Sequence, residues 1–389
     1  MDAQTAEALL DQLAAAAGPE ADWQLATYDK LPLNLVRGQG ARVQDADGRW
    51  YWDLYGGHCV ALIGHSHPTW VAMLHAQAQR LGFYSNVVHS PLRAAACKAI
   101  VDFAPQNLTR VFLSNSGAEA NEVALKLARH HTGRPNIVAM QGGFHGRTLG
   151  ALAVTASEKY RKYALPEYGN TRFVPFGEPV KLDDSVAAVI LEPIQSLAGV
   201  ATAERAWFHG LRAECDRVGA LLIFDEVQTA WGRMGTNFAA DFYGVRVDLL
   251  TSAKGTAGGF PVGATLVDDI IARRAKSGDQ GSTFGAGPLA CAAILATHHV
   301  LREEGLVAQA AAFGQHARKV LPVRVRGEGA LLGLCFDRPV KPILATLRER
   351  GFVAGGSDDP NVMRLMPPLC TPLTVLDELG GVLREILQG

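Results

Sequence analysis

The most informative stretch of this chain is FLSNSGAEANEVALKLAR at residues 112–129, an apolar strand, a turn of small residues and an amphipathic helix. Apolar residues of its second half recur at the spacing of one helix face. Strands and helices keep alternating further along, and several strands are short apolar runs typical of strands buried on both faces. The predicted strands cover residues 111–113, 137–140, 186–191, 221–224, 249–251 and 262–267. This alternation predicts an α/β fold with a mostly parallel sheet covered by helices.

The two ends of the chain differ from its middle. Residues from about 33 to 54 indicate a small β unit with a turn at residues 45–48. The predicted C-terminal elements are a long helical stretch after about residue 290, strands at 323–325 and 331–336, and a helix at 373–387. We therefore expect a large domain over residues 56–290 and a smaller α+β domain built from residues 1–55 and 291–389.

Composition and charge favour a small-molecule partner. The chain has 389 residues, of which 48% are hydrophobic and 19% charged, as in a globular protein with a large core. It carries 37 basic and 38 acidic residues, with no basic run and no acidic tail. Nucleic acid and membrane surfaces are therefore not expected as partners.

The cysteines and the N-terminal residues indicate a cytoplasmic protein without a metal site. Six cysteines lie far apart and none forms a C-x-x-C pair, so we expect reduced thiols rather than disulfides or zinc. His65 and His67 lack acidic or cysteine companions and are interpreted as a turn before Pro68. The first 23 residues contain no lysine or arginine, unlike a signal or transit peptide. No apolar stretch reaches the roughly 18 residues of a membrane span.

Four predicted strand ends carry polar residues, at residues 114–117, Glu192, Asp225 and Lys254. Because parallel sheets bind ligands at the carboxyl ends of their strands, we expect these residues to converge on one site.

Lys254 follows an apolar strand and directly precedes Gly255. A buried ammonium without a partner is costly, and desolvation lowers the pKa of a lysine so that its amine becomes nucleophilic. The alternative is a surface lysine whose flexible stem carries the charge to solvent. This segment alone leaves both interpretations open.

Asp225 ends the apolar strand of LLIFDEVQT, residues 221–229. A carboxylate here could pair with a protonated pyridine nitrogen and keep the ring electron-poor, so that it absorbs the charge of a carbanion. The competing interpretations are a metal ligand and a helix N-cap. Companion metal ligands are missing nearby, which disfavours the metal.

The turn of the opening stretch could bind phosphate. Free N–H groups at a helix start bind anions, Gly117 and Ala118 let a ligand approach the backbone, and Ser116 adds a hydroxyl. The turn matches neither the dinucleotide glycine fingerprint nor the P-loop. An ordinary capped helix is the alternative.

Two glycine-rich loops add further candidates. QGGFHGRT at residues 141–148 offers Phe144 for stacking on a planar ring and Arg147 for a carboxylate. GSTFGAGPLA at residues 281–290 offers the hydroxyls of Ser282 and Thr283.

The order of these motifs is more specific than any one of them. SGAEAN, FHGRT, EPIQ, DEVQT, a strand-borne K-G and GSTFG follow one another along the chain. Together they resemble the class III, ornithine-aminotransferase-like family of pyridoxal-phosphate enzymes, from about residue 31 to residue 387. FHGRT, DEVQ and GSTF match the acetylornithine aminotransferase subgroup. The resemblance implies fold type I, pyridoxal 5'-phosphate as cofactor and a homodimer with shared active sites.

The resemblance also implies roles around the cofactor ring. Lys254 would bind the cofactor covalently and move a proton between substrate and cofactor. Asp225 would pair with the pyridine nitrogen, and Gln228 would face the phenolic oxygen. Phe144 and Val227 would lie on the two faces of the ring.

At the cofactor's other end, the resemblance assigns Ser116, Gly117 and Ala118 to the phosphate. Thr283 would reach the same phosphate from the other subunit. Glu192, in EPIQ, would organise the site beside the ring.

For the substrate, the resemblance implies contacts from Arg147 and Ser282 and places an α-carboxylate at Arg364. Here the sequence departs from the family. Leu197 stands where an acidic residue usually pairs with the carboxylate-binding arginine, and His58 replaces a pocket-lining isoleucine or tyrosine. These departures put the substrate in doubt and leave the cofactor chemistry intact.

The sequence thus predicts a transaminase that moves an amino group between an amino acid and a 2-oxo acid through the pyridoxamine form of the cofactor. N-acetylornithine and 2-oxoglutarate are the default pair, and a different donor is the alternative that Leu197 and His58 raise. An aminomutase or amino-acid racemase of the same fold is a further alternative. Lys254 disfavours a non-catalytic protein, and the missing glycine fingerprint disfavours a nicotinamide dehydrogenase.

Overall fold

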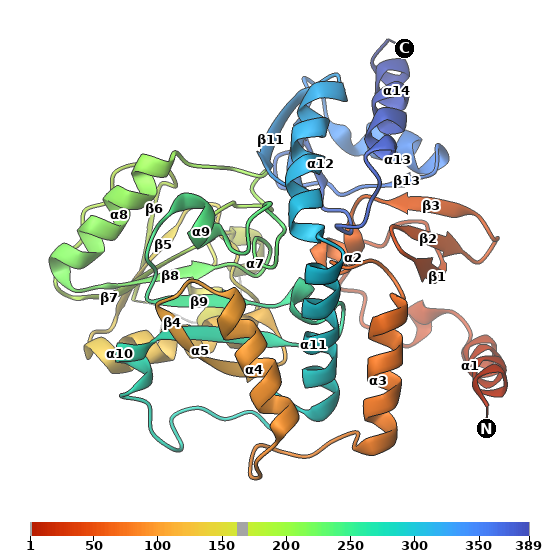
Figure 1. Cartoon of the computed structure of the whole chain (residues 1–389). Coiled ribbons are helices and arrows are strands. Elements are labelled where there is room, and N and C mark those ends of the chain that lie inside the picture. Colours follow the sequence, from red (N-terminus) through yellow and green to blue (C-terminus); the bar gives the residue numbers. More distant parts are fainter. Residues whose placement is uncertain (1, 162–169, 389) are drawn as a thin grey trace.

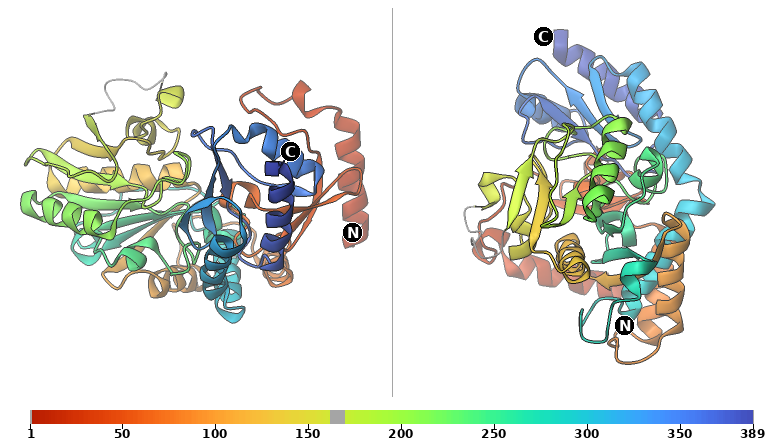
Figure 2. Two further views of the ribbon diagram at one scale, coloured as in Figure 1. Left: turned by 90° about the horizontal axis from the view of Figure 1, so that it is seen from above. Right: turned by 90° about the vertical axis from the view of Figure 1, so that its left-hand side faces the viewer.

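The computed structural model describes residues 2–161 and 170–388. A large α/β unit lies on the left of Figure 1, and a smaller unit at the upper right joins the N-terminal and C-terminal segments. Figure 2 shows the same two units from above and from the side. No helix within these residue ranges is long and apolar enough to cross a membrane.

The large sheet of the described chain has seven strands, and most of its neighbours are parallel. They are β4 (Leu108–Ser114), β5 (Asn136–Met140), β6 (Thr171–Val174), β7 (Val186–Leu191), β8 (Leu221–Asp225), β9 (Leu249–Ser252) and β10 (Gly263–Asp268). Their spatial order is β4-β10-β9-β8-β7-β5-β6, and β10 is antiparallel to both of its neighbours. The predicted α/β class and six predicted strands are confirmed. β6 was missed because it is a short edge strand without a continuous apolar run.

Helices cover both faces of this sheet because consecutive strand residues point to opposite sides. Ile190 and Ile223 belong to the core beneath one face, and Val189 and Phe224 to the core beneath the other. The helices of the first face are α5 (Gly117–Thr132) and α10 (Asp269–Ala272), and those of the second are α4 (Pro91–Phe103), α8 (Arg205–Val218) and α9 (Ala239–Tyr243). The strands are therefore buried on both sides, and their ends are the places left for a site.

The smaller unit contains two sheets. The first sheet holds β1 (Leu35–Gln39), β2 (Arg42–Asp45), β3 (Trp50–Asp53) and β13 (Phe352–Val353), and the second holds β11 (Arg324–Glu328), β12 (Leu331–Cys335) and β14 (Val362–Leu365). Its helices are α12 (Leu306–Val320), α13 (Val340–Glu349) and α14 (Thr374–Gln388). Trp52 of β3 pairs in parallel with Phe352 of β13, which joins the two ends of the chain.

Other helices connect the units or extend from them. They are α1 (Ala3–Ala17), η1 (Glu20–Asp22), α2 (Gly56–Cys59), α3 (Pro68–Arg80), α6 (Leu149–Ala153), α7 (Glu158–Arg161), η3 (Lys254–Ala257) and α11 (Pro288–Glu303). The boundary predicted between residues 290 and 291 falls inside α11, which runs from the large unit towards the small one (Figure 1). The predicted division into residues 1–55, 56–290 and 291–389 stays a prediction.

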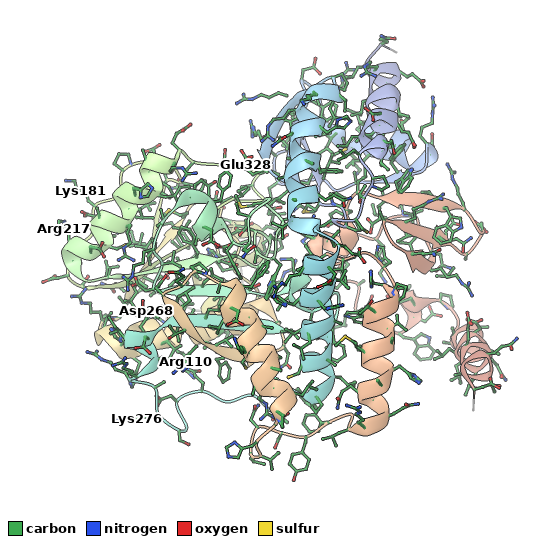
Figure 3. The ribbon with its side chains drawn as sticks, viewed as in Figure 1. Arg110, Lys181, Arg217, Asp268, Lys276 and Glu328 are labelled. Atoms are coloured by element: carbon green, nitrogen blue, oxygen red, sulfur yellow. The ribbon has the colours of Figure 1, made fainter. Side chains whose placement is uncertain are left out.

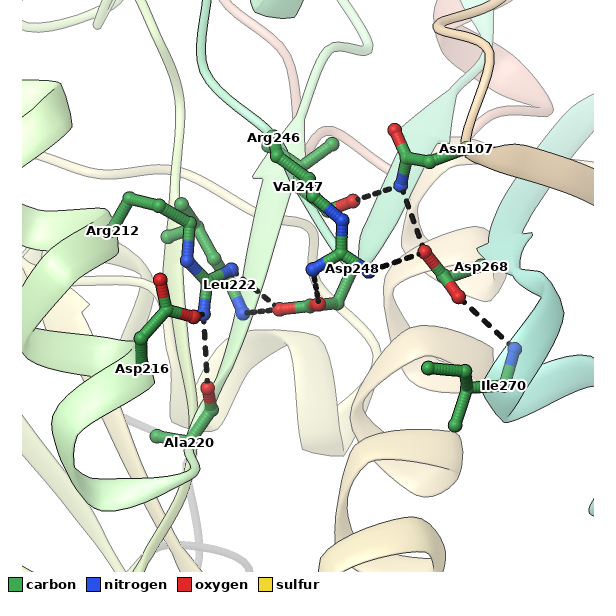
Figure 4. Close-up of polar contacts among 10 residues, drawn as sticks. All are labelled: Asn107, Arg212, Asp216, Ala220, Leu222, Arg246, Val247, Asp248, Asp268 and Ile270. Atoms are coloured by element: carbon green, nitrogen blue, oxygen red, sulfur yellow. Dashed lines mark hydrogen bonds and ion pairs between the residues drawn. The ribbon is translucent and has the colours of Figure 1, made fainter.

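The amino-terminal edge of the large sheet carries a network of ion pairs (Figure 4). Asp248, just before β9, accepts a hydrogen bond from Arg212 at 2.6 Å. Asp268, at the end of the antiparallel β10, accepts one from Arg246 at 2.6 Å. Figure 3 shows Asp268 and Arg110 near one another at this edge. Each of these two aspartates is paired with an arginine, as in an ion-pair network that stabilises the fold.

Candidate active site

A cavity of about 350 Å³ opens at the carboxyl edge of the large sheet. Its walls are apolar with a few convergent polar groups, as in sites for small planar ligands. It is lined by most of the predicted cofactor residues, namely Ser116, Gly117, Ala118, Phe144, Glu192, Asp225, Val227, Gln228 and Lys254. The other predicted residues, Thr283, Ser282, His58, Arg147 and Arg364, lie outside this lining.

Lys254 begins η3 directly after β9 and lines the cavity. Its backbone φ is 43°, a left-handed conformation that non-glycine residues seldom adopt and that clusters at functional sites. Desolvation lowers the pKa of its ammonium, although the carboxylates of Asp225 and Glu192 oppose this. A lysine with a lowered pKa has a larger neutral, nucleophilic fraction. The alternative of a surface lysine does not hold.

Asp225 is held by two hydrogen-bond donors at the mouth of β8. Its Oδ2 accepts hydrogen bonds from Asn121 Nδ2 and from His145 Nδ1, each at 2.7 Å. Thr251 Oγ1 donates to Asn121 Oδ1 at 2.7 Å and so fixes the amide orientation. Both partners donate to the same oxygen and hold the carboxylate in one orientation, as pairing with a ring nitrogen requires.

Sequence reasoning assigned no role to Asn121 or His145. His145 belongs to the loop of Phe144 and Arg147, and Asn121 is a buried polar residue on the otherwise apolar face of α5. A polar residue on this apolar face was the feature of the sequence that could have indicated a role for Asn121. It did not name the partner, because Asp225 lies more than a hundred residues further on.

Glu192 lies at the end of β7 and is buried beside the same cavity. Burial raises the pKa of its carboxyl to about 7, with Asp225 adding to the effect and His145 opposing it. Its Oε1 accepts a hydrogen bond from the Phe144 N–H at 2.8 Å, which fixes the loop that carries the ring. Nearby, the buried side-chain oxygen of Gln228 has no hydrogen-bond partner among the described residues.

The turn before α5 fits both of its predicted interpretations. Ser116 is the N-cap, because its Oγ accepts a hydrogen bond from Glu119 N at 3.2 Å. The N–H groups of Gly117 and Ala118 head the helix, where no intrahelical acceptor exists. A Cβ on Gly117 would stand 2.9 Å from a methyl of Val227. Glycine at position 117 therefore permits the close contact with Val227. The N–H groups at the start of α5 suit a phosphate.

His58 lies on α2, near the positive groups of the site. It adopts a left-handed φ of 69°, and its Nδ1 is hydrogen-bonded to the hydroxyl of Tyr55. Although part of its surface is open to solvent, desolvation by surrounding protein lowers the pKa of His58 to about 3, assisted by the charges of Lys254, Arg364 and Arg147. The imidazole is therefore neutral, and a Tyr55 O–H donated to Nδ1 leaves its hydrogen on Nε2.

Arg147 is exposed and lies outside the cavity lining. Its guanidinium carbon stands 4.5 Å from the ring centre of Tyr160 on α7. The same tyrosine meets Phe144 edge to face at 5.3 Å. Tyr160 thus links the predicted ring-stacking residue to the predicted carboxylate-binding residue, a role that sequence reasoning missed because tyrosine in a polar stretch gives no periodic signal.

Arg364 lies on β14 and is 3% exposed. Its Nε donates to the carbonyl of Gly356 at 2.5 Å, and one terminal nitrogen donates to Ser196 Oγ at 3.2 Å. Within residues 2–161 and 170–388 it forms no ion pair with a carboxylate. Leu197, which follows Ser196, offers no side-chain acceptor.

Ser282 and Thr283 lie on the loop before α11. Ser282 Oγ accepts hydrogen bonds from Asn115 Nδ2 at 3.2 Å and from Gly285 N at 3.0 Å, so it shapes the loop beside the phosphate turn. Thr283 is exposed and does not line the cavity of its own chain. Its neighbour Phe284 is 65% exposed and lines a second, apolar cavity.

The histidines that could have suggested a metal have other partners. His65 pairs with Asp53 at 2.7 Å and His67 with Glu304 at 2.8 Å. Among the described residues, no cluster of three or more histidine, cysteine or acidic side chains could hold a metal ion.

The fold and the cavity define a fold-type I pyridoxal-phosphate enzyme, with a strand-end lysine, a held aspartate and free N–H groups at a helix start. The aminotransferase class-III family model matches residues 24–387, and this chain belongs to that family. It is a pyridoxal-phosphate-dependent aminotransferase, and the resemblance seen in its sequence is confirmed.

Several relatives resemble the whole chain. The acetylornithine aminotransferase of Methanosarcina acetivorans is 39% identical over 378 residues, covering 94% of each protein. A LysW-aminoadipate semialdehyde/glutamate semialdehyde transaminase of Sulfolobus acidocaldarius is 36% identical over 370 residues, covering 92% of this chain and 95% of that protein. The crystal structure of the acetylornithine aminotransferase from Elizabethkingia anophelis superposes with a TM-score of 0.85 at 28% identity, over 97% of this chain and 99% of the other.

Proposed function

We propose that this enzyme transfers the ω-amino group of N-acetylornithine to 2-oxoglutarate. The observation that carries the proposal is the convergence of Lys254 and Asp225 on one cavity in a chain whose full-length relatives include acetylornithine aminotransferases. Arginine biosynthesis is the corresponding pathway.

The described residues fit the cofactor. The helix start at Gly117 and the partnerless side-chain oxygen of Gln228 both line the cavity, where a ligand can satisfy them. In this proposal Gly117, Ala118 and Ser116 hold the phosphate, and Phe144 with Val227 enclose the ring.

Bound pyridoxal phosphate supplies an electron sink for the substrate carbon that carries the amino group. Lys254 supplies the amine that holds the cofactor, and in its neutral form takes the proton from that carbon and returns it. Asp225 would pair with the ring nitrogen, with His145 and Asn121 preventing its carboxylate from turning away. Glu192 positions the Phe144 loop and limits the negative charge beside the ring through its raised pKa.

Two arginines at the substrate end fit the two carboxylates of 2-oxoglutarate. Arg147 is exposed and backed by Tyr160, and Arg364 is buried and held by Ser196. Guanidinium groups bind carboxylates through paired hydrogen bonds. A donor with a single carboxylate would engage one of the two arginines.

We further propose a cytoplasmic homodimer in which Thr283 reaches the phosphate of the neighbouring subunit. Its exposure beside the exposed Phe284 supports this arrangement. Light scattering at assay concentration should give a dimer mass, and Thr283→Ala should weaken cofactor retention. A fully active monomer would contradict the arrangement.

A panel of amino donors tests the substrate. The cofactor-loaded enzyme, mixed with N-acetylornithine, ornithine, glutamate or alanine, should lose the visible absorbance of the lysine-bound cofactor fastest with N-acetylornithine. Adding 2-oxoglutarate should restore the absorbance. Slow reaction with N-acetylornithine but rapid reaction with another ω-amino donor would redirect the assignment, and turnover without any 2-oxo acid would indicate an aminomutase or racemase.

A further inference from the structure

The guanidinium of Arg364 is a buried cation whose hydrogen-bond partners are neutral. Gly356 O and Ser196 Oγ accept from two of its nitrogens. The Tyr55 hydroxyl is a further neutral hydrogen-bonding neighbour of this guanidinium, whose third nitrogen is not among the fully enclosed partnerless atoms. An unpaired buried charge is costly, and a guanidinium does not escape by deprotonation. The site therefore favours any anion that can reach that nitrogen.

Charged groups of the site act on Arg364, but none among the described residues is paired with it. Its positive charge contributes to lowering the pKa of both Lys254 and His58. Desolvation lowers the pKa of Arg364 itself, while Tyr55 and the acidic groups Asp358 and Glu192 oppose this. Glu192 is the buried acid whose own pKa is raised to about 7, and Asp358 is exposed. Neither forms an ion pair with Arg364 in the described part of the chain.

The substrates of the proposed reaction differ in the charge they bring. 2-Oxoglutarate and glutamate carry two carboxylates and can satisfy both Arg147 and Arg364. N-acetylornithine carries a single carboxylate, its acylated α-nitrogen is uncharged, and its other end is the reacting amine. When that single carboxylate is held at Arg147, Arg364 faces the uncharged part of the donor.

We infer that Arg364, oriented by Ser196 and Gly356, is a binding site for a small monovalent anion such as chloride, filled when the bound substrate brings only one carboxylate. The anion site itself depends only on the geometry of Arg364, and its effect on the amino donor rests on the proposed function. A bound chloride neutralises the guanidinium during the donor half-reaction and leaves when a dicarboxylate enters. Chloride therefore assists one half-reaction and competes in the other.

Leu197 offers a matched pair of variants. Leu197→Glu places a carboxylate next to Ser196 and supplies an internal anion, whereas Leu197→Gln adds similar size without charge. Leu197→Glu should abolish the dependence on chloride, and Leu197→Gln should keep it. Ser196→Ala tests orientation, because it should weaken anion binding while Ser196→Thr, which keeps the hydroxyl, restores it.

The binding arm uses crystals of the cofactor-loaded enzyme soaked in bromide, with anomalous scattering to locate the ion. We expect a bromide against Arg364 in the native enzyme and in Leu197→Gln, and none there in Leu197→Glu or Arg364→Gln. A native enzyme without bromide at Arg364 would overturn the inference, whatever its substrates are.

The kinetic arm follows each half-reaction in chloride and in a bulky sulfonate salt at equal ionic strength. Chloride should speed the reaction with N-acetylornithine by roughly tenfold, the value of one charge-assisted interaction, and raise the apparent KM for glutamate. If both Leu197 variants respond to chloride alike, the effect on the donor is refuted. If N-acetylornithine does not react under any condition, the proposed function fails while the bromide result still decides the anion site.

Discussion

The two edges of the large sheet contain similar residue types in opposite states of charge balance. At the amino edge, Asp248 and Asp268 each receive an arginine at 2.6 Å, and one nitrogen, Nε of Arg212, lacks a partner among the described residues (Figure 4). At the carboxyl edge, no arginine or lysine is paired with Asp225 among the described residues, and its hydrogen bonds come from Asn121 and His145.

Among the described residues, Lys254 and Arg364 at the carboxyl edge form no ion pair with a carboxylate. Lys254 has a lowered pKa, and Arg364 is bonded to a carbonyl and a hydroxyl. We infer that the ion pairs of the amino edge stabilise the fold. The unpaired charged groups of the carboxyl edge are available to bind ligands. Mutations at the two edges should therefore separate activity from stability.

Lys254→Ala should have the largest effect, because no other described group at the cavity can hold the cofactor and move the proton. Turnover should fall to background while the protein still binds pyridoxal phosphate through phosphate and ring contacts. Mass spectrometry after borohydride reduction should find the cofactor on the Lys254 peptide in the native enzyme and none in the variant. Covalent cofactor elsewhere in the variant would contradict the assignment.

Asp225→Ala should lower kcat by about 10²–10³, the usual cost of removing one preorganised electrostatic partner. Its neighbours His145 and Asn121 remain hydrogen-bonding groups that water can reach in the opened cavity, so thermal stability should change little. Asp225→Glu, which keeps the charge, should recover part of the rate. Near-normal turnover of the alanine variant would place the ring nitrogen elsewhere.

Asp248→Ala should give the reverse pattern. Removing this buried carboxylate leaves the Leu222 N–H without its acceptor and leaves Arg212 with only Asp216 and Ala220, at a cost of about 2 kcal/mol in the free energy of unfolding. The folded fraction should keep the native kcat. Asp216→Ala is the matched control, because its ion pair with the same arginine is largely exposed and should contribute little. A kcat loss in Asp248→Ala without unfolding would refute the comparison.

His58→Gln should have the smallest effect, and only in acid. The pKa of His58 is lowered from 6.5 to about 3, so the folded protein favours the neutral ring. The stability associated with that ring is fully present above about pH 6.5 and is lost as the pH falls towards 3. The variant should lose less stability over this range in acid denaturation, and its activity profile above pH 6.5 should keep the native shape. A new inflection above pH 6.5 would show that His58 titrates there.

The sequence predicted the parts that local patterns encode. Strand ends and the helix start of 117–132 follow from apolar runs and capping residues, and they delivered Lys254, Asp225 and Gly117 to one cavity. The contacts of Asp225 with Asn121 and His145 could not be predicted, because they join segments whose pairing depends on the order of strands in space.

The substrate end was less predictable for a related reason. In the sequence, Ser196 is a small residue in a predicted loop. Its hydrogen bond with Arg364 depends on the packing of β14 beside that loop. The same holds for β13, which has two residues and no periodic signal of its own.

The pairing of Trp52 with Phe352 has a consequence for synthesis of the chain. During translation the first sheet of the small unit lacks β13 until the ribosome has made residues 352–353, long after β3. Closing so long a loop is entropically unfavourable and slow, and the waiting edge of β3 can pair wrongly. Newly made chains should therefore depend on chaperones in proportion to the time that this edge stays open, and a circular permutant that joins the two termini should shorten that time.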